Sequence, residues 1–236
     1  MNPLNIHYSS QLIRDCSNES DRLAGATPSK SSNSGHAKVL KEAIQKGVQQ
    51  TPLTVDDLSR WHSLIVQERT DRGCQIHEVA MNLYKANADD LAEANKLVDL
   101  INERTKLENY PTSDVERVNL IAKIFQDFEK MPQFNDAHHS LGRILVNYMN
   151  SRLFTPIFIF KLSEKEQLEK AATDLNVARL FFASKVKEMA FDSFYHLLDL
   201  NSHSGDSYSY VDSEGHGTTI EYHALAKAEK TWQAQS

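Results

Sequence analysis

Apolar residues recur at three- and four-residue steps along most of this chain, which is the pattern of amphipathic helices. The segment 37–50 shows it clearly, with Leu40, Ala43, Ile44 and Val48 on one face. A wider stripe in residues 115–128 predicts a central, largely buried helix. The same spacing predicts helices in further segments, which are 58–65, 91–101, 141–149, 168–175 and 180–200.

Few residues interrupt these helices. The 236 residues include only 8 Gly and 6 Pro, and neither type occurs between Gly73 and Pro111 or from Ile157 to His203. Long stretches without such residues favour helix. We therefore predict an all-α fold.

Polar residues mark three of the helix starts. Ser or Thr followed three residues later by an acidic residue is typical of a helix N-terminus. The three pairs are Thr54 with Asp57, Ser113 with Glu116, and Ser163 with Glu166.

The chain divides into a helical domain at residues 37–200 and two flanking segments. The first flanking segment, residues 1–36, is predicted to form an N-terminal helix followed by a loop. The predicted loop spans residues 17–36 and contains six serines. Residues 201–236 predict a flexible tail, with a short last helix from about Ile220 to Trp232. The strand signal is slight and favours one small β-hairpin flap at Cys74–Tyr84.

Composition and charge argue against several classes of protein. Lys and Arg total 26 and Asp and Glu total 32, and a net charge of −6 argues against a nucleic-acid-binding protein. No apolar run reaches the roughly 18 residues of a membrane span. Asp15, Glu19 and Asp21 interrupt the opening stretch, which argues against a secretory signal. Two cysteines are too few for a disulfide framework, so we expect a cytoplasmic protein.

The segment from Pro132 to Arg143 combines a loop with the start of a helix, and it is the strongest candidate for a binding site. A helix N-terminus presents unpaired N–H groups and suits a phosphate, and Arg143 would lie one turn inside it. Asp136 could hold Mg²⁺ against that anion. On these residues alone, a simpler interpretation has Asp136 as a helix cap and Phe134 as a core side chain.

The same segment resembles the signature of the Fic (Fido) domain, which runs His-x-Phe-x-Asp/Glu-Gly/Ala-Asn-Gly/Lys-Arg-x-x-Arg. Phe134, Asp136, Ala137 and Arg143 match that pattern in position. The segments Trp61-His62-Ser63-Leu64 and Arg152-Leu153-Phe154-Thr155-Pro156-Ile157 are similar to flanking parts of the domain. The resemblance covers residues 30–200 and implies a Fic-like helical bundle.

Fic domains transfer AMP from ATP to a protein, so the resemblance implies ATP or another nucleotide as ligand, with Mg²⁺. It places Asp136 at the metal position, Phe134 at the buried anchor and Arg143 at the second arginine. Ala137 falls in the phosphate-binding backbone and Ser140 at the first arginine, which makes both nucleotide-binding candidates.

The signature also departs from the family. The catalytic histidine position is Pro132, which has no titratable group and cannot act as a general base. His138 stands at the asparagine position and His139 at the small-residue position. Both are candidate substitutes for the missing base, because imidazole titrates in the right range.

Three hypotheses follow. The first is a degenerate Fic-like protein that lacks AMP transfer and binds a nucleotide or a protein partner. The second is an active transferase that modifies a protein hydroxyl through Asp136, Arg143 and one of the two histidines. The third is a helical interaction module, such as a bacterial effector delivered into a host cell, with the 201–236 tail as its recognition or delivery segment.

Overall fold

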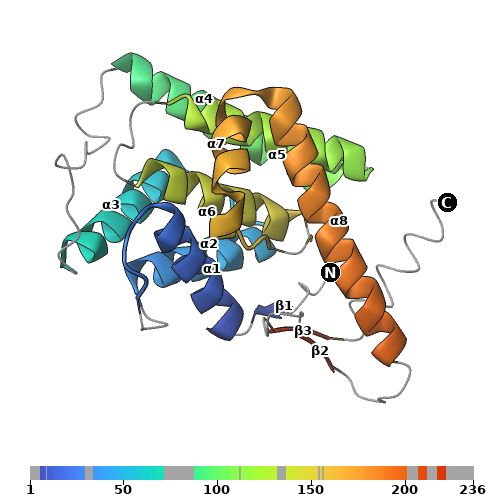
Figure 1. Ribbon diagram of the computed structural model, residues 1–236. Helices are drawn as coiled ribbons and strands as arrows, with labels where there is room; N and C mark the ends of the chain where they lie inside the picture. Colours follow the sequence, from blue (N-terminus) through green and yellow to red (C-terminus); the bar gives the residue numbers. More distant parts are fainter. Residues whose placement is uncertain are drawn as a thin grey trace.

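Helices make up most of the structure, so the predicted all-α architecture is confirmed (Figure 1). The computed structural model describes residues 6–8, 10–29, 34–71, 88–111, 113–131, 137–153, 155, 157–200, 207–211 and 217–221. Those ranges contain eight α-helices: α1 (Ser10–Leu23), α2 (Gly35–Val48), α3 (Val55–Asp71), α4 (Ala88–Arg104), α5 (Asp114–Glu129), α6 (His138–Arg152), α7 (Lys165–Thr173) and α8 (Leu175–Leu200). None of these helices is long and apolar enough to cross a membrane.

A small antiparallel sheet accompanies the helices. It joins β1 (Ile6–Tyr8), β2 (Ser207–Val211) and β3 (Gly217–Glu221), with β3 in the middle. Ile220 pairs with Ile6 on one side and Tyr208 on the other. Figure 1 shows the sheet beside the lower ends of α1 and α8.

The sheet corrects the loop predicted for residues 201–219, because residues 207–211 and 217–221 are strands. Ile220 and Glu221 belong to β3, and the rest of the predicted last helix lies outside the described residues. The alternation of Ser and Tyr in 207–210 and the β-branched residues Thr218, Thr219 and Ile220 favour strands, although serines and glycines around them suggested a loop. The predicted hairpin at Cys74–Tyr84 lies outside the described residues.

The central helix of the fold is α6. The wide apolar stripe in residues 115–128 predicted instead that α5 would be central. Every residue of α6 except His139 is buried, and the helix packs against α1, α2, α3 and α5 (Figure 1). Several polar residues on α6 are buried, and hydrogen bonds inside the protein compensate for their lost hydration. Asn147 pairs with both the N–H and the C=O of Phe158, and Arg152 donates to the Thr51 carbonyl at 3.0 Å. A hydropathy pattern does not reveal burial of this kind.

The N-terminal segment is more helical than its serines suggested. The loop predicted from residue 17 begins only after Leu23, since α1 continues to that residue. Its apolar face packs into the core through Leu12, Ile13, Cys16 and Leu23. The serines remain in the helix because their hydroxyls are hydrogen-bonded, as where Ser17 donates to the Arg14 carbonyl at 2.9 Å.

Two of the three predicted helix starts are confirmed. Thr54 and Asp57 exchange hydrogen bonds at the start of α3, and Ser113 and Glu116 form a complete capping box at α5. The Ser163 prediction is wrong. The chain makes a 3-10 turn at Leu162–Glu164, in which Glu164 accepts from the Lys161 N–H at 2.9 Å, and α7 begins at Lys165.

Helices α2 and α6 cross where Gly47 allows close approach. A Cβ atom added at Gly47 would lie 2.6 Å from the Tyr148 carbonyl oxygen and 2.8 Å from Ser151 Cβ. The clash is with backbone and with a short side chain, so a larger residue requires the helices to separate.

Overpacking usually costs about 1–3 kcal/mol, and the clash with backbone places Gly47→Ala at the upper end of this range. Alanine returns about 1 kcal/mol through its helix propensity, so we expect a net loss of about 1–2 kcal/mol in the free energy of unfolding. Urea unfolding followed by circular dichroism measures it, with Lys41→Ala on the exposed face of α2 as the control. A Gly47→Ala variant as stable as the wild type would contradict the close contact.

Candidate functional site

The predicted site lies where the loop after α5 leads into α6. Pro132, Phe134 and Asp136 lie outside the described residues, so the missing base, the buried anchor and the Mg²⁺ ligand stay predictions. Ala137 is the buried N-cap residue of α6, and its side chain supplies no capping hydrogen bond. The described part of the site is therefore the first two turns of α6 and the groups that face them.

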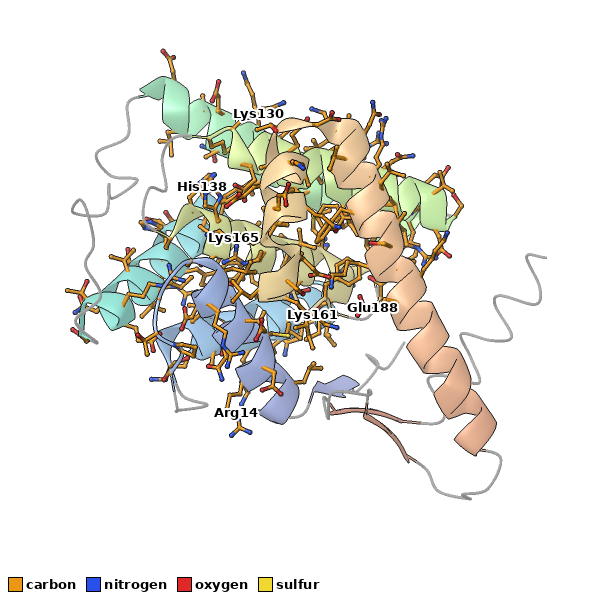
Figure 2. The ribbon with its side chains drawn as sticks, in the orientation of Figure 1. Arg14, Lys130, His138, Lys161, Lys165 and Glu188 are labelled. Atoms are coloured by element: carbon orange, nitrogen blue, oxygen red, sulfur yellow. The ribbon has the colours of Figure 1, made fainter. Side chains whose placement is uncertain are left out.

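The two histidines proposed as substitute bases both lie near Oε2 of Glu129 but differ in their exposure to solvent. His138, which is labelled in Figure 2, is buried. Its ring is stacked on Phe128, with ring centroids 4.7 Å apart, and burial lowers its pKa. The His139 side chain is 71% exposed, and its Nδ1 lies 2.5 Å from Oε2 of Glu129. The hydrogen bond to Glu129 raises the pKa of His139. Only His139 combines access to solvent with a carboxylate partner.

Arg143, which matches the second arginine of the Fic signature in position, is buried and hydrogen-bonded within the fold. Its Nε donates to Ser20 Oγ at 2.9 Å, and its Nη2 donates to the Ser20 carbonyl at 2.9 Å and to Ser140 Oγ at 3.1 Å. Burial lowers the pKa of Arg143 to about 9. The guanidinium thus fastens α6 to the end of α1.

A second buried arginine extends this network to α3. The Nη2 of Arg69 donates to Ser140 Oγ at 2.6 Å and to Asp21 Oδ1 at 3.1 Å. The same Asp21 oxygen lies 3.1 Å from Nδ1 of His36, near the start of α2. Side chains from α1, α2, α3 and α6 therefore meet around one carboxylate and two guanidinium groups.

The charges in this network depend on one another. Burial acts to raise the pKa of Asp21, but the hydrogen bonds and charges of His36 and Arg69 outweigh it and hold that pKa below its usual range. Burial lowers the pKa of His36, and the neighbouring guanidinium charges of Arg69 and Arg143 add to this effect. We infer that Asp21 is ionised and that a neutral His36 donates its Nδ1–H to it.

Three residues predicted to contact a nucleotide can be compared with this geometry. Ala137, Ser140 and Arg143 are all buried, and the side chains of the last two are bonded to other groups of the chain. Their contact with a nucleotide stays a prediction. In the described part of the chain, no group of three or more His, Cys, Asp and Glu side chains is arranged to hold a metal ion.

Sequence reasoning missed several residues that shape the site. Ser20, Asp21 and His36 lie in the 17–36 segment, whose serines predict a loop, so the sequence pattern does not indicate their buried partners. Glu129 is the last residue of α5, and the apolar stripe of that helix does not indicate that this carboxylate is buried. A usable signal was Gly142, because a glycine inside a helix often marks close contact with another group.

Comparison with known proteins does not assign a family. No family model, curated protein or solved structure matches the chain. The likeness to Fic domains consequently depends on the residues of the 132–143 segment and its flanking helices. Function has to be inferred from the geometry of the site.

We expect Asp21→Asn to lower the free energy of unfolding by about 3–5 kcal/mol at pH 7, because it leaves Arg69 buried without its charged partner. The folded-state pKa of Asp21 is lowered, so its stabilising effect is complete above the ordinary value of 3.8 and decreases progressively as the pH falls from 3.8 towards the lowered pKa, with part of it lost at pH 3. Urea unfolding at pH 7 and pH 3 measures both effects. Asp99→Asn, on the exposed face of α4, is the control; equal stability of the two variants at pH 7 would contradict the pairing.

Proposed function

We propose that this chain is a Fic-like helical protein that does not transfer AMP and that acts by binding a protein partner. The observation that supports this proposal best is the state of Arg143. Its Nε and Nη2 bond to Ser20 and Ser140, and its side chain is buried beneath α1. An arginine that fastens two helices together is not available to a phosphate group.

The neighbouring positions agree with this proposal. Ser140 stands where the family has its first arginine, so a positive charge is replaced by a hydroxyl that accepts hydrogen bonds from Arg69 and Arg143. Pro132 stands where the family has its general base, and the loss of such a base typically slows a reaction about a hundred- to ten-thousand-fold. Binding a protein requires neither group.

One observation favours a second function, transfer of a nucleotidyl group to a protein hydroxyl. His139 is exposed at the start of α6, and Glu129 holds its Nδ1. This imidazole could replace the base that Pro132 removes. The transfer would also need groups that bind phosphate, but the candidates Ser140 and Arg143 are already hydrogen-bonded within the protein.

Incubation of the purified chain and a cell lysate with Mg²⁺ and ATP labelled on its α-phosphate separates the two functions. We expect no label on any protein and no saturable heat when Mg²⁺-ATP is titrated into the chain. Labelling that is present with the wild type and absent with His139→Gln would contradict the first proposal and support the second. The substitution should leave the fold intact, because His139 is exposed and glutamine keeps an N–H donor for the buried Glu129 carboxylate.

A further inference from the structure

Strand β2 has a partner on only one of its two edges among the described strands. The central strand β3 pairs with β1 on one side and with β2 on the other, so β2 lies at the edge of the sheet. Figure 1 shows β2 as the strand farthest from α1. We propose that β2 pairs antiparallel with β2 of a second copy of this chain, across a two-fold axis at Ser209. This inference goes beyond the proposed function and does not depend on it.

The backbone of β2 carries hydrogen-bonding groups that β3 does not use. In an antiparallel pair, residues whose N–H and C=O point to one neighbour alternate with residues whose groups point to the other side. All five residues of β2, from Ser207 to Val211, are in register with β3. Alternate residues of β2 therefore direct an N–H and a C=O away from β3. Such an edge is a template for a further strand.

The β2 edge lacks the usual protection against pairing with another chain. Proteins commonly protect a sheet edge by making it short, or with a charge, a proline or a bulge. The sequence of β2 is Ser-Tyr-Ser-Tyr-Val, which contains no charged residue and no proline. Its residues pair one by one with consecutive residues of β3, so this strand has no bulge. The opposite edge is shorter, because β1 has only three residues.

A second copy of β2 is a suitable partner because the strand is complementary to itself. When two antiparallel copies are centred on Ser209, all five residues of each strand are paired. Tyr208 then lies opposite Tyr210 of the other copy, and Ser207 lies opposite Val211. No like charges meet, and opposed aromatic residues are favourable cross-strand pairs. Both copies use the same patch, as a two-fold interface requires.

The proposed register also continues one face of the sheet. Pairing within the chain places Tyr208 on the same face as Ile220, and Ile220 shares that face with Ile6. Tyr210 belongs to this face as well, since it is two residues from Tyr208 along the strand. The tyrosines of the two copies therefore extend the same face across the axis. A shift of one residue would end the match between them.

The interface is small, so the dimer should dissociate on dilution. Each copy contributes five residues to the strand pair. Stable protein interfaces usually bury at least about 1,200 Å², which is more than one short strand pair supplies. Two three-stranded sheets joined in this way make one sheet of ordinary size.

Analytical ultracentrifugation of the full chain over a range of concentrations tests the inference. We expect the mean mass to rise with concentration from 26.8 kDa towards twice that value. Ser209→Lys should remain monomeric, because it places two like charges opposite each other at the axis. His7→Lys is the control, since it lies in the same row of the sheet but on the β1 edge, and it should dimerise like the wild type. A wild type that stays monomeric at every concentration would overturn the inference, as would a Ser209→Lys variant that dimerises like the wild type.

Cysteine cross-linking tests the register and keeps the inference falsifiable if Ser209→Lys disturbs the sheet. Opposite residues in an antiparallel pair have Cα atoms about 4.5–5.5 Å apart, which suits a disulfide. In a Cys74→Ser background, Ser209→Cys should form a disulfide-linked dimer under mild oxidation. Thr219→Cys is the control, because it pairs with Ser209 within the chain and its two copies would lie three strand spacings apart, about 14 Å. Absence of the linked dimer with Ser209→Cys, or equal linkage of the two variants, would overturn the proposed pairing.

Discussion

The structure depends on keeping two arginine side chains, Arg69 and Arg143, inside the protein. A buried guanidinium is stable only if an opposite charge and enough acceptors surround it. Asp21 pairs with Arg69, and the charges of Glu129 and Asp21 both favour the protonated Arg143. Ser20 and Ser140 supply acceptors. Ser20 and Asp21 belong to α1, so the N-terminal helix must dock on α3 and α6 for the arginines to be satisfied.

The same principle explains why α6 can be the central helix although it is rich in polar residues. Near its C-terminus Arg152 donates to the carbonyls of Thr51 and Thr105, and Asn147 binds the backbone of Phe158. These bonds attach loops from three parts of the chain to one helix. At its N-terminus, Glu129 attaches the end of α5 in a similar way, but through a histidine that remains exposed.

Sequence alone predicted the helices whose apolar faces are continuous, and it selected the segment that leads into α6. It could not predict contacts that tertiary structure creates. Asp21 and Arg69 are 48 residues apart, and β1 pairs with a strand near the other end of the chain. Hydropathy also treats a serine or an arginine as exposed, whereas Ser20 and Arg143 are buried because each supplies the other with a hydrogen-bond partner. Local patterns predicted the elements, and the polar network determined how they are joined.

Native-state hydrogen exchange tests the central claim most directly, since it compares the stability of α1 with that of α6 in the intact chain. If the arginine network fastens α1 to the core, its amides from Arg14 to Leu23 should exchange with nearly the same opening free energy as the amides of α6. Exchange of α1 through a separate opening of low free energy, while α6 stays protected, would contradict the account. That result would mean that the arginines do not need α1 and that Arg143 can reach a ligand.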